Sequence, residues 1–292
     1  MDTITGAHNL TGGLKKKVND PNIFKVGQFI KLPTLNEIPE KFKLGEPRLK
    51  NQYQSDFCGG FSGAGQSEFQ EDTELSPEYQ FALAKAVEGD VEGWGVQLVS
   101  VCKSLVKYGS IPKSKAKYSL ENESPAFLRD LKNWDEGLLL DAQRHKKQSY
   151  FEVKGPYDGF DDVRATMWYF REEKVAVLMG VEWGWDLSDV YIDVQKDGFG
   201  HAMYVIGWDG DYLMVVNSAG DKAGDRGIHY IHRNIINRSV DLWGAYGVID
   251  TPRNAIEYHI KTETYMKDDW VTVFIKQIIN ILCTIKSYLK KS

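Results

Sequence analysis

Segments with helical periodicity fill the first half of this 292-residue chain, and segments of strand type fill most of the second half. Apolar residues spaced as on one face of a helix recur over 61–72, 77–87, 95–108 and 125–145. Beyond residue 150, apart from a short helix predicted over 160–171, the pattern changes to apolar runs separated by turn residues, at 151–154, 175–181, 201–208, 212–217 and 227–232. Helices followed by an antiparallel sheet predict an α+β fold with two lobes, and the cleft between them is the natural place for a site.

Composition shifts divide the chain into three parts. Residues 1–31 are polar and contain glycine and lysine, so they are predicted to form an irregular arm. Residues 32–250 carry the helices and strands, and residues 251–292 form an extension with an amphipathic helix over 270–289. The apolar stripe of that helix is too broad for a solvated tail. Its fate is open: packing on the main domain, lying at a membrane surface, or binding a protein partner or further copies.

Charge and cysteine content exclude several classes of protein. The net charge of -5 gives no electrostatic case for a nucleic-acid partner. The chain has 3 cysteines, and so small and uneven a number argues against a framework of disulfide bonds. The N-terminus lacks the apolar core of a signal peptide, and no apolar run is long enough for a transmembrane helix. We therefore expect a cytoplasmic or virion-associated protein, with peripheral membrane association through the C-terminal helix as an option.

Cys58 is the candidate nucleophile. It stands at the predicted start of a helix, where backbone N–H groups and the helix dipole favour a thiolate. A thiolate is the nucleophile that acyl transfer needs. A lone cysteine is more often a small buried hydrophobic residue, and Cys102, which lies among apolar residues, is assigned to the core for that reason.

A base and its orienting group lie on two consecutive predicted strands. His201 begins one strand and Asn217 ends the next, and the Asp209-Gly210 turn between them is typical of a hairpin that brings them close together. An Asn side-chain oxygen can accept from one ring nitrogen of the histidine and leave the other facing the thiol. Gln52 can donate an amide N–H to a developing oxyanion, with the Cys58 backbone N–H as the second donor.

In this order and spacing, these residues resemble the papain-like (C1-type) cysteine peptidases, in which His and Asn lie about 130–150 residues beyond the Cys. The resemblance covers residues 32–250 as a papain-like peptidase domain. It includes Leu75-Ser76-Pro77-Glu78 at the start of a helix. It implies a two-lobe fold, a peptide or protein substrate, and no metal or cofactor. It also implies substrate binding by Gly93, Trp94 and Gly200.

The sequence departs from the family at several positions. Gly59 and Ala219 stand where the family has tryptophans, and loss of the second should expose the hydrogen bond between His201 and Asn217 to water. Ser55 replaces a half-cystine. The arm is too short for the family's helical inhibitory segment, although it is long enough to lie across the cleft.

Two hypotheses follow from this pattern. The first is a cysteine peptidase that uses Cys58, His201 and Asn217 with Gln52 at the oxyanion hole. The alternative is a weakened or inactive homologue that serves as a structural or docking protein, such as a viral particle component. His229 and His232 lie on opposite faces of a predicted strand, so no metal site is expected there.

Overall fold

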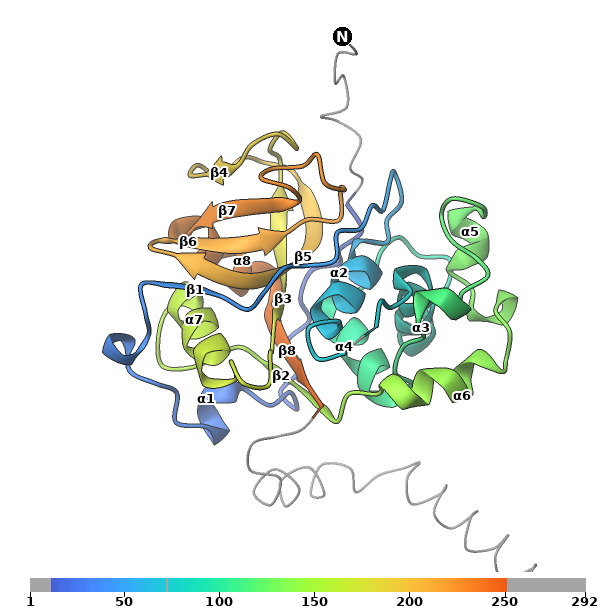
Figure 1. Ribbon diagram of the computed structural model, residues 1–292, viewed down its shortest axis with the longest axis horizontal. Coiled ribbons are helices and arrows are strands. Elements are labelled where there is room, and N and C mark those ends of the chain that lie inside the picture. The colour runs from blue at the N-terminus through green and yellow to red at the C-terminus, as the bar shows by residue number, and fades with distance from the viewer. Residues whose placement is uncertain (1–11, 72, 251–292) are drawn as a thin grey trace, which may run out of the picture. The chain divides into compact units, whose positions relative to one another are not determined.

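The computed structural model describes residues 12–71 and 73–250. Contacts divide the chain between Asp250 and Thr251. The helix predicted over 270–289 lies outside the described residues. The described part has a helical lobe and a sheet lobe, as Figure 1 shows. The predicted α+β architecture is confirmed. No helix in the described ranges is long and apolar enough to cross a membrane.

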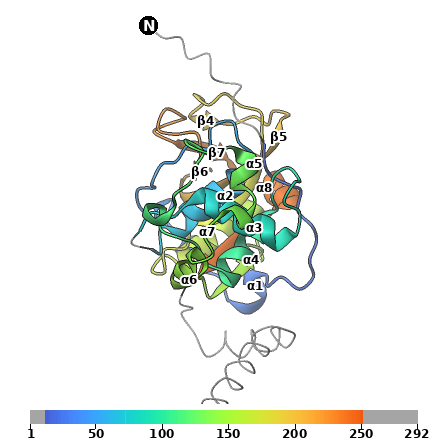
Figure 2. The same cartoon turned by 90° about the vertical axis from the view of Figure 1, so that its right-hand side faces the viewer.

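The helical lobe is built around one short, completely buried helix. Its helices are α2 (Cys58–Ser67), α3 (Pro77–Glu88), α4 (Leu98–Lys107), α5 (Pro125–Leu128) and α6 (Leu138–Ala142). Figure 2 looks onto this lobe. Helix α2 packs closely against α3 and α4 because glycines line it: a Cβ on Gly60 would lie 2.4 Å from the carbonyl oxygen of Pro77. The predicted cap of α3 is confirmed, since the Ser76 side chain accepts from the Tyr79 N–H at 3.3 Å.

The sheet lobe is one mainly antiparallel sheet with the strand order β2-β8-β3-β5-β6-β7-β4 and with β1 beside β5. The strands are β1 (Lys41–Lys43), β2 (Ser149–Glu152), β3 (Val177–Trp183), β4 (Tyr191–Ile192), β5 (Phe199–Asp209), β6 (Tyr212–Val216), β7 (Ile228–His232) and β8 (Ala245–Ile249). Helices α1 (Val26–Phe29), α7 (Gly159–Tyr169) and α8 (Arg233–Trp243) complete the lobe. The predicted hairpin is confirmed, with Asp209 paired to Tyr212.

Strands β3 and β5 are buried on both faces, which explains their continuous apolar sequences. On β3, Val177 and Met179 belong to the core shared with α7 and α8, whereas Leu178 belongs to the core shared with the helical lobe. On β5, Met203 and Ala202 divide in the same way. The two lobes are therefore joined through β3 and β5, the second of which carries the candidate base.

The single helix predicted over 125–145 is wrong. The segment contains α5, a 3-10 turn at Leu131–Asn133, α6 and a second 3-10 turn at Gln143–His145. The Asp130 side chain accepts from the Lys132 N–H at 3.0 Å, a local bond that competes with helix continuation. Strands β1, β4 and β8 and helices α1 and α8 were not anticipated from the sequence, and α1 is a short helical turn in the arm that was predicted to be irregular.

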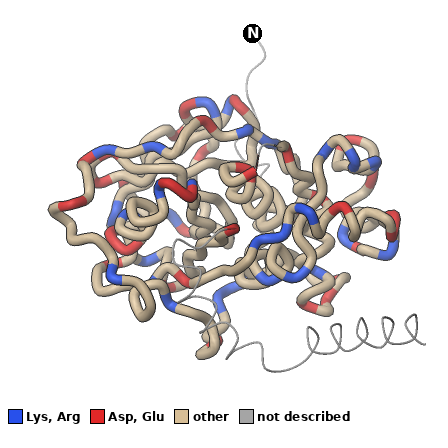
Figure 3. The backbone as a smooth tube through the Cα atoms, turned by 60° about the horizontal axis from the view of Figure 1, so that its bottom comes forward, with Lys and Arg blue, Asp and Glu red and all other residues tan. Residues whose placement is uncertain are grey.

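Charged residues lie interspersed along the chain. In Figure 3, Lys and Arg alternate with Asp and Glu over both lobes in the view shown. This distribution agrees with the small net charge of the sequence. The absence of a nucleic-acid partner stays a prediction.

Candidate active site

Cys58 is the first residue of α2, where the two lobes meet. Its N-cap residue, Phe57, offers no side-chain hydrogen bond, so backbone N–H groups of the first turn remain available to an anion. The amides of Ala202, Gly13 and Gly59 face the thiol and lower its pKa. Burial outweighs them and raises the pKa to about 11, because Cys58 has no exposed surface. The expected thiolate is therefore a neutral thiol in this closed form.

The N-terminal arm is what covers the thiol. The Gly13 carbonyl accepts from the Val96 N–H at 2.9 Å, and the Lys15 N–H donates to the Val96 carbonyl at 3.0 Å. On the other side, the Leu14 N–H donates to the carbonyl of Gly200 on β5 at 3.2 Å. The arm thus bridges the two lobes directly over Cys58, as its length allowed.

Glycine is required where the arm passes the thiol. A Cβ on Gly13 would lie 1.9 Å from the carbonyl oxygen of Asp56, and a Cβ on Gly12 would lie 2.8 Å from that of Gly200. Both contacts are with backbone atoms, which cannot move away by a change of rotamer as a side chain can. The Gly12-Gly13 pair therefore lets the backbone approach this closely.

Ion pairs hold the next residues of the arm. The Lys15 ammonium lies 2.6 Å from a Glu88 oxygen and 2.8 Å from an Asp90 oxygen. The Lys17 ammonium binds Glu152 on the sheet lobe. These partly exposed pairs add attachment at both sides of the lobe boundary.

His201 and Asn217 meet as the hairpin predicted. Nε2 of His201 lies 2.9 Å from Oδ1 of Asn217, and both residues are buried. Nδ1 of His201 is buried and has no hydrogen-bond partner within residues 12–71 and 73–250. The amide of the next residue, Ala202, faces the Cys58 thiol, so this part of β5 lies against the start of α2. Burial lowers the pKa of His201 to about 4, so the ring is neutral at pH 7.

The predicted exposure of this hydrogen bond is wrong. Trp183 on β3 packs edge-on against the His201 ring, with centroids 5.8 Å apart, and Phe199 packs on it as well. These rings exclude water although Ala219 has no indole to offer. At Gly59, the methyl group of Val96 would lie 2.4 Å from a Cβ, so Val96 fills the space beside the helix start.

Gln52 lies fully buried just before α2. Its Nε2 donates to the Ser55 carbonyl at 2.7 Å, and its Oε1 accepts from the Ser218 hydroxyl at 2.5 Å. The Ser55 hydroxyl in turn donates to the Gln52 carbonyl at 2.7 Å. Ser55, which replaces a half-cystine, therefore stabilises the turn that carries Gln52.

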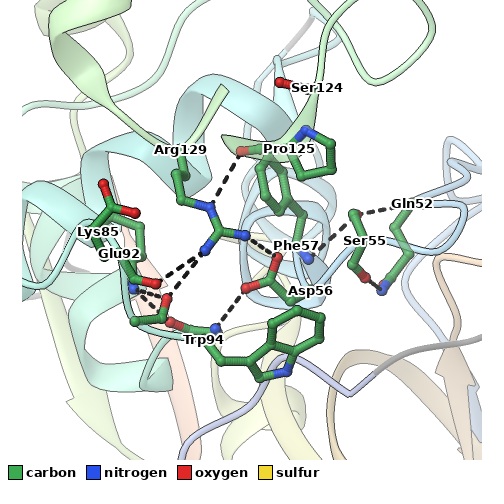
Figure 4. A network of polar contacts seen from close by, with 12 residues as sticks. Gln52, Ser55, Asp56, Phe57, Lys85, Glu92, Trp94, Ser124, Pro125 and Arg129 are labelled. Carbon is green, nitrogen blue, oxygen red and sulfur yellow. Dashed lines mark hydrogen bonds and ion pairs between the residues drawn. The ribbon is translucent and has the colours of Figure 1, made fainter. Parts of the chain in front are cut away.

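Three charged residues that were not anticipated hold the loop before α4 (Figure 4). Asp56 is 1% exposed; one of its oxygens accepts from the Gly95 N–H at 2.7 Å, and the other lies 2.9 Å from the Arg129 guanidinium. Lys85 donates to the carbonyls of Gly93 and Gly95 at 2.6 and 3.1 Å. The only signal in the sequence was a lysine within the apolar stretch of α3.

The loop held by this network contains Gly93 and Trp94, two of the residues expected to bind substrate. The Gly93 carbonyl faces Lys85, and the residue that pairs with the arm is Val96. Trp94 contacts the arm through its indole N–H, which donates to the Gly12 carbonyl. Of the residues expected to bind substrate, Gly200 and Trp94 thus contact the strand that occupies the site, whereas Gly93 supports the loop.

Comparison with known proteins rests on structure. No protein-family model matches the chain, and no curated protein matches it. Xylellain, a cysteine protease from Xylella fastidiosa, is similar with a TM-score of 0.67 at 19% identity, over 84% of this chain and 97% of that one. ProCathepsin B S9 from Trypanosoma congolense is similar with a TM-score of 0.59 at 17% identity, over 86% and 89% of the two chains. This is the papain-like fold.

A third solved structure agrees. The bromelain protease from Ananas comosus has a TM-score of 0.53 at 16% identity, and the match covers 73% of this chain and 100% of the bromelain chain. In the papain-like fold of this chain, α2 begins with the candidate nucleophile and β5 carries the candidate base. The arrangement can supply a thiol, a neutral imidazole acceptor and backbone N–H donors at one point.

Proposed function

We propose that this protein is a papain-like cysteine peptidase that hydrolyses peptide bonds of a peptide or protein substrate. The observation that carries the proposal is the buried 2.9 Å hydrogen bond between His201 and Asn217. It uses Nε2 of the histidine and leaves Nδ1 without a partner in the described part of the chain, while the amide of the next residue, Ala202, faces the Cys58 thiol. A ring held in this way is ready to accept the thiol proton.

The reaction follows from these positions. Cys58 transfers its proton to Nδ1 of His201 and attacks the substrate carbonyl, which forms a C–S bond. The oxyanion accepts from the Cys58 backbone N–H and from the Gln52 amide, whose other N–H donates to Ser55. His201 then protonates the amine as the C–N bond breaks, which leaves the acyl group on Cys58 as a thioester. His201 next takes a proton from water, which attacks the thioester, and returns it to the sulfur as the C–S bond breaks. No step needs a metal or a redox cofactor.

Substrate must replace the arm before this chemistry begins. The backbone groups of Val96 and Gly200 that hold Gly13, Leu14 and Lys15 are those an extended peptide would use. When the arm leaves, water reaches the thiol and the desolvation that raises its pKa to about 11 is relieved. The N–H groups of Ala202 and Gly59, which stay when Gly13 leaves with the arm, then favour the thiolate.

The test uses the full-length protein and a fluorogenic peptide library. Wild type should cleave members of the library, Cys58→Ala should cleave none, and Cys102→Ala should serve as a control that retains turnover. A Cys58→Ala protein as active as wild type would refute the mechanism. An inactive wild type whose Cys58 resists iodoacetamide at pH 6 even after the arm is removed would favour the docking homologue.

A further inference from the structure

A second buried histidine lies directly behind Asn217. His229 is on β7, next to the strand that leads into Asn217, and has no exposed surface. Its Nε2 lies 3.3 Å from Nδ2 of Asn217, and its Nδ1 lies 2.6 Å from the carbonyl oxygen of Asp189. The ring of Trp183 packs against His229 at 4.9 Å as well as against His201. One indole therefore covers both imidazoles.

The hydrogen bonds of this row have a fixed direction. A carbonyl oxygen only accepts, so Nδ1 of His229 must carry the proton that is donated to Asp189. In a neutral ring, Nε2 is then an acceptor, and it must receive an N–H from the Asn217 amide. Burial lowers the pKa of His229 to about 4, which keeps the ring neutral at pH 7.

The direction is passed on to the next ring. Because the NH2 group of Asn217 is committed to His229, its oxygen faces His201 and can only accept. Nε2 of His201 must therefore carry the proton, which leaves a lone pair on Nδ1. A flipped amide would present NH2 to His201 and favour the opposite tautomer, whose Nδ1 already carries a proton and cannot act as a base.

We propose that His229 is a positioning residue that sets the tautomer of His201 by fixing the orientation of the Asn217 amide. The catalytic consequence rests on the proposed peptidase function, whereas the tautomer itself does not. The Asp189 carbonyl fixes the tautomer of His229, His229 fixes the orientation of the Asn217 amide, and that amide fixes which nitrogen of His201 keeps a lone pair.

The first test measures the tautomers directly. The chain has 6 histidines, so 15N-histidine labelling of the full-length protein gives a tractable spectrum at pH 7. Wild type should show His201 protonated at Nε2 and His229 protonated at Nδ1. His229→Phe keeps a ring but has no acceptor, and the His201 resonances should then shift to a mixture of tautomers. His229→Gln, whose side-chain oxygen can accept from Asn217, should restore the wild-type pattern.

The second test is kinetic. His229→Phe should lower kcat by about fivefold to tenfold with little change in KM, as expected for the loss of one neutral hydrogen bond, and His229→Gln should recover most of it. His232→Phe, on the opposite face of the same strand, is the matched control. An unchanged His201 tautomer in a folded His229→Phe protein would overturn the proposal. A shifted tautomer in a protein without peptidase activity would instead refute only the proposed function.

Discussion

Replacing Leu14 with alanine should open the active site. Leu14 is 9% exposed, packs in the core of the helical lobe and follows Gly13, whose amide faces Cys58, so it is an apolar anchor of the part of the arm that covers the thiol. Leu14→Ala removes three buried carbons, each worth about 0.8 kcal/mol, so the docked arm should lose about 2.4 kcal/mol. At 1.4 kcal/mol per tenfold change, the population of the open form should rise roughly 50-fold.

The assay is alkylation of Cys58 by iodoacetamide, followed by mass spectrometry of the peptide that contains it. Burial of the thiol, with its pKa near 11, makes the closed form unreactive, so the labelling rate reports the open fraction. Leu14→Ala should label about 50 times faster than wild type. Lys16→Ala is the matched control, because Lys16 is an exposed residue of the same arm.

One result would refute this reasoning. If Leu14→Ala labels Cys58 at the wild-type rate and melts at a lower temperature, Leu14 is a fixed part of the core and the arm does not open by itself. If Lys16→Ala labels as fast as Leu14→Ala, the burial of Leu14 is not what holds the arm.

Arg129→Ala should raise KM and lower the free energy of unfolding by about 3–5 kcal/mol, because it leaves the buried Asp56 charge unpaired beside the loop it holds; an unchanged KM and melting temperature would contradict the role of this ion pair. Asn217→Ala should lower kcat much less than His201→Ala, since the first orients and the second transfers the proton; equal losses would contradict this division. Acid should destabilise the fold, because His201 and His229 have folded pKa values of about 4, below the unfolded value of 6.5. Between pH 4 and pH 6.5 the unfolded chain binds more protons than the folded chain. The free energy of unfolding at pH 5 should therefore be about 2 kcal/mol per ring lower than at pH 7. Urea titrations at both pH values measure this, and a variant with glutamine at both positions that keeps the full acid sensitivity would refute it.

Local chemistry made several elements predictable. Ser76-Pro77-Glu78 predicted the start of α3, and Asp209-Gly210 predicted the β5–β6 hairpin. Both could be predicted because helix caps and tight turns depend on residues close together in the chain. The prediction of one helix over 125–145 was wrong because a local interaction was overlooked. The apolar spacing of this segment suited a helix, but the Asp130 side chain stabilised a break.

By itself, the sequence determined the fold class, from the order of its periodic segments, and the residue types at positions 52, 58, 201 and 217. It also predicted an arm long enough to lie across the cleft, whereas the close passage of Gly12-Gly13 was seen only in the structure. Only the tertiary structure decided that the arm closes over Cys58, that Trp183 covers the His201–Asn217 hydrogen bond, and that His229 stands behind Asn217. Burial, pKa and hydrogen-bond direction depend on groups far apart in the chain, and such groups acquire defined distances only when β3, β5, β6 and β7 pair.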